Sequence, residues 1–93
     1  MAAVDARELE TPLVLRRWKQ GDYFYPLGMR KKKKLSRFFI DEKVPLHRKQ
    51  QLWVLVSGER VVWIVGMRLD DRFKVTPATR RIVEFAFAAA GTP

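Results

Sequence analysis

Nine basic side chains gather in one short part of the chain, between residues 16 and 37. Five of them are consecutive, from Arg30 to Lys34, and the others flank this run on both sides. Clustered cations bind phosphate backbones well, because each neutralised phosphate releases a condensed counterion. The pattern therefore predicts a nucleic-acid-binding surface made of Arg16, Arg17, Lys19, Arg30, Lys31, Lys32, Lys33, Lys34 and Arg37.

The distribution of charge supports a localised surface. The chain has 93 residues and a formal net charge of +9. Residues 16–49 hold twelve Lys or Arg and three acids, so this window alone accounts for the net charge, and the seven bases and seven acids elsewhere cancel. A positive field from one segment is typical of a protein that attracts a polyanion. The alternative is a lysine run that is only solvated, or that resembles a nuclear-localisation signal.

Aromatic residues are interleaved with these cations. Four of them lie between Arg17 and Arg30: Trp18, Tyr23, Phe24 and Tyr25. Aromatic rings can stack on unpaired bases. A domain of this size also needs such rings for its core, so we assign Trp18 and Phe24 to the core before assigning them to bases.

The residues that catalysis or metal binding would need are scarce. The chain has no cysteine, one histidine (His47) and no Gly-x-x-x-x-Gly-Lys-Ser/Thr loop. We expect His47 to lie on the surface. Asp70 and Asp71 form the only adjacent pair of aspartates, and neighbours in an extended segment point in opposite directions. We expect them to form salt bridges with Arg68 and Arg72 near a turn, and we predict no catalytic residue and no metal site.

The cationic segment begins at the end of a predicted strand. The apolar run 12–15 predicts this strand, which delivers Arg16 and Arg17 to its end. Because Arg16 would be fixed there, it is the preferred candidate for a bidentate phosphate contact, with the lysines acting as point charges. Gly21-Asp22 and residues 26–28 are turn signals, and Asp22 is expected to order its turn rather than to contact nucleic acid.

Two short helices are predicted after the lysine run. Leu35, Phe38 and Phe39 have the spacing of one helical face. This helix must end before Pro45, because proline pushes the preceding residue toward an extended conformation. Pro45 can then open a second short helix, over residues 46–52.

A β-hairpin is the clearest element of the sequence. Residues 52–56 and 61–65 are rich in β-branched and aromatic side chains and are separated by a turn that contains Gly58. Both strands are apolar at every position, so we expect them to be central and covered by the helices on one face and by loops or a partner on the other. Trp63 should be buried. Residues 66–75 look irregular, and residues 82–87 predict a last strand.

These elements predict a single α+β domain with an antiparallel β-hairpin or sheet and two short helices. We expect residues 1–87 to form the domain and residues 88–93 to be a frayed tail. The sequence contains neither an apolar stretch of about 18 residues nor the apolar region of a signal peptide, so we expect a cytoplasmic location and no membrane partner.

The order of motifs resembles a known family. The motifs are Gly21-Asp22, Pro26-Leu27-Gly28-Met29, Lys33-Lys34-Leu35-Ser36, Phe38-Phe39-Ile40-Asp41, Lys43-Val44-Pro45, Trp63-Ile64-Val65-Gly66-Met67-Arg68 and Asp71-Arg72-Phe73-Lys74. From about Val4 to about Thr79 the chain is similar to the C-terminal domain of bacterial tRNA(Ile)-lysidine synthetase. The family more often has an acid where this chain has Arg37, which leaves the role of Arg37 open.

The resemblance implies a function for the parent protein. Members of this family are ATP-dependent ligases that attach lysine to the wobble cytidine of the isoleucine tRNA with a CAU anticodon. Their catalytic domain, which binds ATP with magnesium through a Ser-Gly-Gly-x-Asp-Ser loop, is absent from this chain. The resemblance thus implies a non-catalytic tRNA-binding domain, on the acceptor-stem side, with tRNA and the catalytic domain as partners and no cofactor of its own.

Two other functions remain open from the sequence. The chain could be a protein-interaction or dimerisation module of the same or another RNA-modifying protein, docking the catalytic domain or forming a homodimer. It could also be a small enzyme in its own right, although the missing motifs weigh against this.

Overall fold

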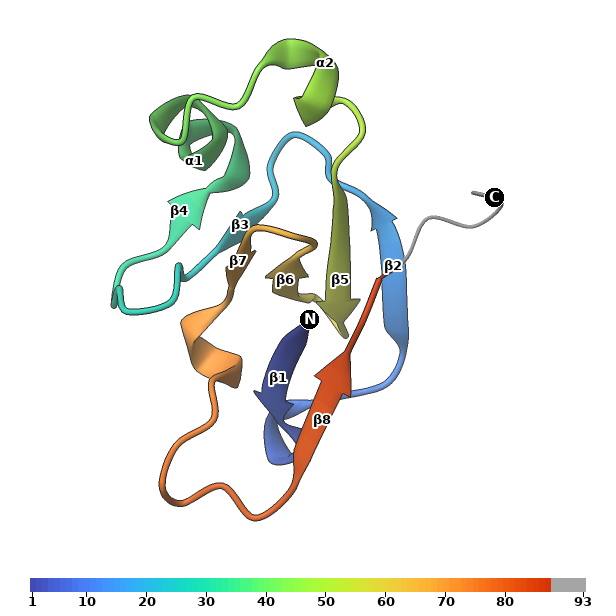
Figure 1. The fold of residues 1–93 in the computed structure, drawn as a ribbon, viewed down its shortest axis with the longest axis vertical. Helices are drawn as coiled ribbons and strands as arrows, with labels where there is room; N and C mark the ends of the chain where they lie inside the picture. The colour runs from blue at the N-terminus through green and yellow to red at the C-terminus, as the bar shows by residue number, and fades with distance from the viewer. Residues whose placement is uncertain (88–93) are drawn as a thin grey trace.

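A four-stranded antiparallel sheet lies at the centre of the fold (Figure 1). The computed structural model describes residues 1–87. The strand order of the central sheet is β2-β5-β6-β7. Its strands are β2 (Leu13–Arg17), β5 (Trp53–Ser57), β6 (Arg60–Ile64) and β7 (Arg68–Leu69).

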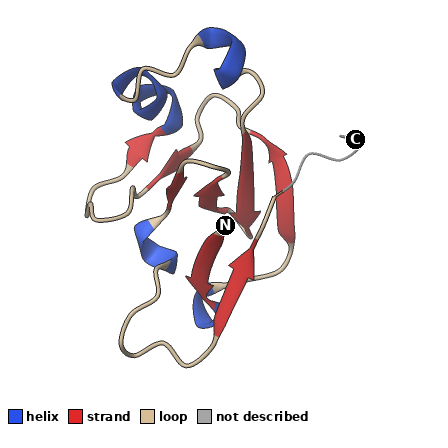
Figure 2. Ribbon diagram, in the orientation of Figure 1, coloured by secondary structure: helices blue, strands red, loops and turns tan. Residues whose placement is uncertain are grey.

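Two small antiparallel pairs and four short helices surround this sheet (Figure 2). One pair joins β1 (Ala2–Asp5) to β8 (Ile82–Phe85), and the other joins β3 (Tyr23–Phe24) to β4 (Lys33–Lys34). The helices are η1 (Ala6–Glu8), α1 (Leu35–Asp41), α2 (Leu46–Lys49) and η2 (Asp71–Phe73). The predicted α+β class with two short α-helices is confirmed.

The β5–β6 hairpin is the centre of the core. Both strands are buried on both faces from their second residue to their last, which explains why they are apolar at nearly every position. Adjacent residues of β5 contribute to different clusters: Val54 and Val56 pack on the side of α1, and Leu55 packs on the side of β1. The predicted hairpin is therefore confirmed, with residues 53–57 and 60–64 as its strands.

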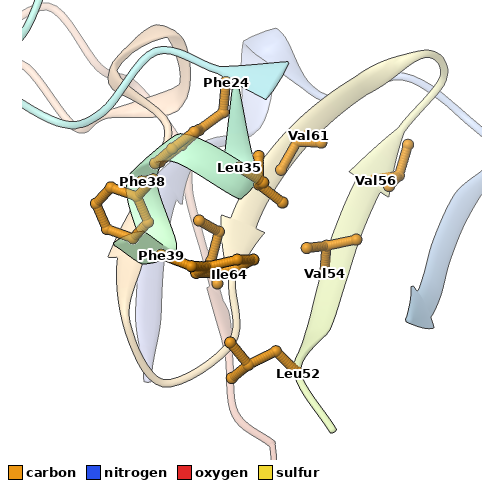
Figure 3. Packing of buried hydrophobic residues seen from close by; sticks show 9 residues of the cluster. All are labelled: Phe24, Leu35, Phe38, Phe39, Leu52, Val54, Val56, Val61 and Ile64. Atoms are coloured by element: carbon orange, nitrogen blue, oxygen red, sulfur yellow. The ribbon is translucent and has the colours of Figure 1, made fainter. Parts of the chain in front are cut away.

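Helix α1 covers one face of the hairpin with the three residues that its spacing predicted. Leu35, Phe38 and Phe39 are all buried, and Figure 3 shows them beside the β5–β6 hairpin, with Phe39 next to Ile64. Phe24 fills the same cluster from β3 and is fully buried. The rings of Trp18 and Phe39 pack in a T-shaped arrangement with centroids 5.0 Å apart. Both rings assigned to the core thus lie there.

The β1–β8 pair covers the other face, and only its strand β8 was predicted from the sequence. Val4 of β1 packs with Leu55, Val62, Trp63 and Phe73 in a second cluster. Strand β1 pairs in register with β8, from Ala2 opposite Phe85 to Asp5 opposite Ile82. The two ends of the described chain therefore close the core together, where the sequence predicted loops or a partner.

Several boundaries differ from the sequence-based predictions. Helix α2 ends at Lys49 rather than at residue 52, and strand β8 ends at Phe85 rather than at residue 87. The segment expected to be irregular contains β7 and η2. The predicted tail, residues 88–93, lies outside the described residues.

Trp63 gives the first test of this core. Its side chain is 6% exposed and packs against the β1–β8 pair. We expect Trp63→Ala to lower the free energy of unfolding by about 3–5 kcal/mol, because the substitution leaves a large cavity. Urea denaturation measures this change. Ile40→Ala, which alters a residue 63% exposed on α1, should change stability by less than about 0.5 kcal/mol; equal effects of the two substitutions would show that the core is misassigned.

Candidate nucleic-acid interface

The β3–β4 hairpin presents the lysine run at one edge of the molecule (Figure 1). Tyr23 pairs with Lys34, and Phe24 pairs with Lys33. Because successive strand residues point to opposite faces, Phe24 and Lys33 share the inner face, and Tyr23 and Lys34 share the outer one. The consecutive lysines therefore occupy different environments.

Lys33 is used within the fold. Its ammonium forms an ion pair with Asp41 of α1 and lies 6.0 Å from the ring centroid of Phe38. Arg37 reaches the same carboxylate, with 3.4 Å between Nε and Oδ1. The bond from Lys33 is the main reason why the pKa of Asp41 lies below its usual range. The outer lysines, by contrast, face solvent.

Asp22 holds the start of β3. The guanidinium of Arg16 donates to both of its carboxylate oxygens at 2.9 Å, and the amide of Lys19 donates to Oδ2 at 2.8 Å. The amide of Leu35 donates to the Asp22 carbonyl at 3.0 Å. One residue thus links the end of β2, the turn at 19–22 and the start of α1, so the prediction that Asp22 orders its turn is confirmed.

The pKa of Asp22 reflects two opposing effects. Burial raises it, but the hydrogen bonds from Arg16 and from the Lys19 amide, together with the nearby positive charges, hold the pKa of this carboxyl below its ordinary value. Bonding to Asp22 in turn raises the pKa of Arg16 against a smaller effect of burial. Arg16 was the preferred candidate for a bidentate contact with phosphate, but its guanidinium forms this kind of contact with the Asp22 carboxylate.

Asp70 holds the end of β3. This carboxylate is fully buried. Its Oδ2 accepts the amide of Tyr25 at 2.9 Å, and the guanidinium of Arg72 donates to Oδ1 at 3.0 Å and to Oδ2 at 2.9 Å. Arg72 also lies over the ring of Tyr25, 4.4 Å from its centroid. Burial is tolerated because the charge is paired and hydrogen-bonded.

The loop after β3 is tied to the neighbouring segment. The amide of Met29 donates to the carbonyl of Pro26 at 2.8 Å, and Gly28 has φ +87°, which a type II turn requires at its third position. The amide of Leu27 donates to the carbonyl of Leu69 at 3.0 Å. The amide of Gly28 donates to Oδ1 of Asp71 at 3.0 Å, which lowers the pKa of that carboxyl.

Six of the nine predicted binding residues form no ion pair within the described part of the chain. Arg16, Lys33 and Arg37 form ion pairs with Asp22 or Asp41. Within residues 1–87 the other six side chains form no ion pair: Arg17, Lys19, Arg30, Lys31, Lys32 and Lys34. Of these, Arg17 donates to the carbonyl of Gln50 at 3.0 Å and lies over the ring of Trp53. Arg17 ends β2 and is not part of the β3–β4 hairpin.

The outer face of the hairpin combines an aromatic ring with cations. The side chain of Tyr23 is 42% exposed. The ammonium of Lys32 lies 4.7 Å from its ring centroid, and Lys34 is its partner across the strands. Beside Tyr23, a groove of about 400 Å³ is also lined by two bases, Arg16 and Lys19, and by two acids, Asp22 and Glu59. This arrangement can bind phosphates through its cations and offers one ring for stacking.

Two features of the site escaped the sequence analysis. Asp70 and Arg72 do pair, as predicted, but the sequence did not indicate that Asp70 is buried and supports the hairpin. The predicted pairing of Arg68 with these aspartates is wrong, because its guanidinium faces Glu42 of the α1 terminus, 3.7 Å away. The support of the hairpin by Asp70 depends on its contact with the amide of Tyr25, which is 45 residues away in the sequence, and no local pattern indicates this contact.

Residues 1–87 contain no group of three or more His, Asp or Glu side chains placed to hold a metal ion. No helix in this part of the chain has the length and apolar character needed to cross a membrane.

The fold of this small α+β domain occurs in solved structures. The crystal structure of a TilS C-terminal domain superimposes with a TM-score of 0.71 at 24% identity, covering 86% of this chain and 63% of that one. An N-terminal fragment of the phenylalanyl-tRNA synthetase β-subunit from Pyrococcus horikoshii gives a TM-score of 0.68 at 16% identity, covering 87% of this chain and 26% of that one. At these identities the likeness defines the fold alone.

Sequence comparison defines the family. The family described as the TilS substrate C-terminal domain matches residues 13–85, and this chain belongs to it. A tRNA(Ile)-lysidine synthase from Parabacteroides distasonis is 45% identical over 83 residues, and one from Bacteroides thetaiotaomicron is 40% identical over 82. These matches cover 89% and 88% of this chain but 19% of each relative, so the chain spans about a fifth of their length.

The pairing of Asp22 with Arg16 predicts how stability depends on pH. Because the pKa of Asp22 is lowered by folding, its contribution is complete above the unfolded pKa of about 4 and is lost as the pH falls through the folded value. We expect Asp22→Asn to cost roughly 1–3 kcal/mol at pH 7 and clearly less near pH 2. Urea denaturation at both pH values measures the two differences.

Glu59→Gln is the matched control, because Glu59 is exposed and forms no ion pair within the described residues. It should change stability little at either pH. If Asp22→Asn costs as much at pH 2 as at pH 7, the ionised carboxylate is not what holds the turn.

Proposed function

We propose that this chain is a non-catalytic tRNA-binding domain whose β3–β4 hairpin contacts the acceptor-stem side of the tRNA. The observation that carries this proposal is a set of exposed cations that form no ion pair in residues 1–87 and lie on an anchored hairpin. Arg30, Lys31, Lys32 and Lys34 have no ion-pair partner in residues 1–87, whereas the residues at the base of the hairpin are fixed by Asp22 and Asp70.

The chemistry of double-stranded RNA suits such a surface. An A-form stem displays phosphates and 2′-hydroxyls across a wide, shallow minor groove and is recognised mainly by shape. Lysines on a fixed hairpin provide the charge, and the rigid base sets their spacing. In this proposal Arg16 supports the surface by holding Asp22, and Arg17 and Lys19 extend it toward the end of β2.

The names of the relatives suggest which larger protein contains this domain. The similar proteins are named tRNA(Ile)-lysidine synthase. We propose that this chain serves an ATP-dependent ligase that attaches lysine to the wobble cytidine of a tRNA with a CAU anticodon, in the cytoplasm. ATP and magnesium belong to a separate catalytic domain of the same polypeptide, and the present domain holds the tRNA while that domain acts.

Replacing two loop lysines tests this proposal. We expect Lys31→Ala/Lys32→Ala to weaken tRNA binding and to reduce the slope of log affinity against log salt by about 1 per lysine, since each lost phosphate contact releases fewer counterions. The melting temperature should stay unchanged, because both side chains are exposed. Fluorescence anisotropy with labelled tRNA, repeated at several salt concentrations, measures the slope.

Lys43→Ala/Arg48→Ala is the control with the same loss of charge. Both residues are exposed and lie outside the hairpin, after α1 and in α2. This variant should bind with a nearly unchanged slope. Equal losses in the two variants, or an unchanged slope in the loop variant, would mean that the lysine run is only a solvated surface.

The second candidate function is a dimerisation module, which the edge strand β2 favours. Within the described residues β2 pairs only with β5. Leu13, Val14 and Leu15 are 43%, 41% and 44% exposed. An unpaired apolar edge can add a strand from a second copy.

Sedimentation equilibrium separates this function from the proposed one. If β2 is an interface between copies, the chain forms a dimer at micromolar concentration that does not depend on salt, and Leu13→Lys/Leu15→Lys abolishes it. A monomer at all concentrations tested would exclude this second function.

A further inference from the structure

A cavity lies between the two 3₁₀ helices, η1 and η2, and the segment 74–81. None of its lining residues belongs to the positively charged segment 16–49. Its volume is about 640 Å³. Five basic side chains line it: Arg7, Arg72, Lys74, Arg80 and Arg81. All five come from the part of the chain whose charges cancel overall, so composition alone gave no sign of a second cationic site.

The wall of this cavity is ordered by hydrogen bonds between the two ends of the domain. Asp5 accepts the amide of Arg7 at 2.9 Å and the hydroxyl of Thr79 at 3.0 Å, across 74 residues of sequence. The Thr79 hydroxyl also accepts the amide of Thr76 at 2.8 Å. The amide of Ala6 donates to the carbonyl of Arg81 at 3.0 Å. The backbone that carries the arginines is therefore held in place before any ligand binds.

Two of the three acids in this wall form side-chain hydrogen bonds, whereas three of the bases form none within residues 1–87. Asp71 accepts from Lys74 at 3.2 Å and from the Gly28 amide, and Arg72 is held by Asp70. Within residues 1–87 the side chains of three arginines form no hydrogen bond or ion pair: Arg7, Arg80 and Arg81. Two acids of the wall also keep their negative charge within residues 1–87: Glu8 forms no side-chain hydrogen bond or ion pair, and Asp5 accepts only from neutral donors. The balance of uncommitted charge in the cavity is positive.

We propose that this cavity binds a phosphate group of the RNA that the β3–β4 hairpin holds. The inference rests on the proposed function. Helix η2 lies between the hairpin loop and the segment 74–81 (Figure 1), and Asp71 of η2 bonds Gly28 in the loop while it also lines the cavity. The hairpin and the cavity thus belong to one edge of the molecule, along which an RNA stem can reach both.

The phosphate can have two sources in the same RNA. A terminal phosphate carries about −1.5 to −2 charges at pH 7 and can enter a concave site at the end of a strand. A backbone phosphodiester carries one charge and lies within a continuous strand. Three guanidiniums around a cavity suit either group, because arginine donates in a planar fork that fits phosphate oxygens.

Binding of a short acceptor-stem hairpin RNA, with a 5′-phosphate or a 5′-hydroxyl, tests the inference. We expect Arg80→Ala/Arg81→Ala to weaken binding about 5-fold to 30-fold at low salt, compared with the control Lys43→Ala/Arg48→Ala. A loss confined to the phosphorylated RNA identifies a terminal phosphate, and a loss for both RNAs identifies a backbone phosphate. The backbone bond from Ala6 to Arg81 persists in this variant, and Arg7→Ala, from the opposite wall, gives an independent measurement.

The outcomes separate this inference from the proposed function. If Lys31→Ala/Lys32→Ala weakens binding but the Arg80/Arg81 and Arg7 variants match the control, the hairpin binds RNA and the cavity does not. If none of these variants weakens binding, both the cavity and the hairpin are misassigned.

Discussion

Two aspartates fix the ends of strand β3, and the presentation of the cationic hairpin depends on them. An isolated two-stranded hairpin is marginally stable in water, and β3 and β4 have only two residues each. Asp22 joins the start of β3 to β2 through Arg16, and Asp70 joins its end to η2 through the Tyr25 amide and Arg72. Between them Phe24 is buried in the core. A hairpin too short to be stable by itself is therefore held rigidly enough to present charge.

The same arrangement explains how the fold tolerates a dense group of cations. Like charges in consecutive positions repel one another, and a protein reduces this cost by placing acids among them or by exposing the charges to water. This chain does both. Lys33 turns inward to Asp41, and Arg37 shares that carboxylate. Lys31, Lys32 and Lys34 are exposed to solvent, where their charges cost little. One lysine run thus contains both an ion-paired lysine and exposed lysines without an ion pair in residues 1–87.

Local patterns predicted the core elements, and contacts between distant residues escaped prediction. The apolar runs of β5 and β6 and the spacing of Leu35, Phe38 and Phe39 were sufficient, because burial on defined faces leaves a clear periodic signal. Strand β1 has the sequence Ala-Ala-Val-Asp and leaves no such signal; it forms because β8, from the other end of the domain, pairs with it. The roles of Arg16 and Asp70 likewise depend on partners that turn geometry and tertiary packing bring together.

The central claim is that the β3–β4 hairpin, and not the β2 edge, is the surface that meets RNA. The most direct measurement is a titration of the isotope-labelled chain with an acceptor-stem duplex, followed by amide chemical shifts in two-dimensional NMR. The account predicts that the largest shifts fall on residues 23 and 30–34, with weak effects at Leu13, Val14 and Leu15. Shifts concentrated at Leu13, Val14 and Leu15, with the hairpin unchanged, would contradict it.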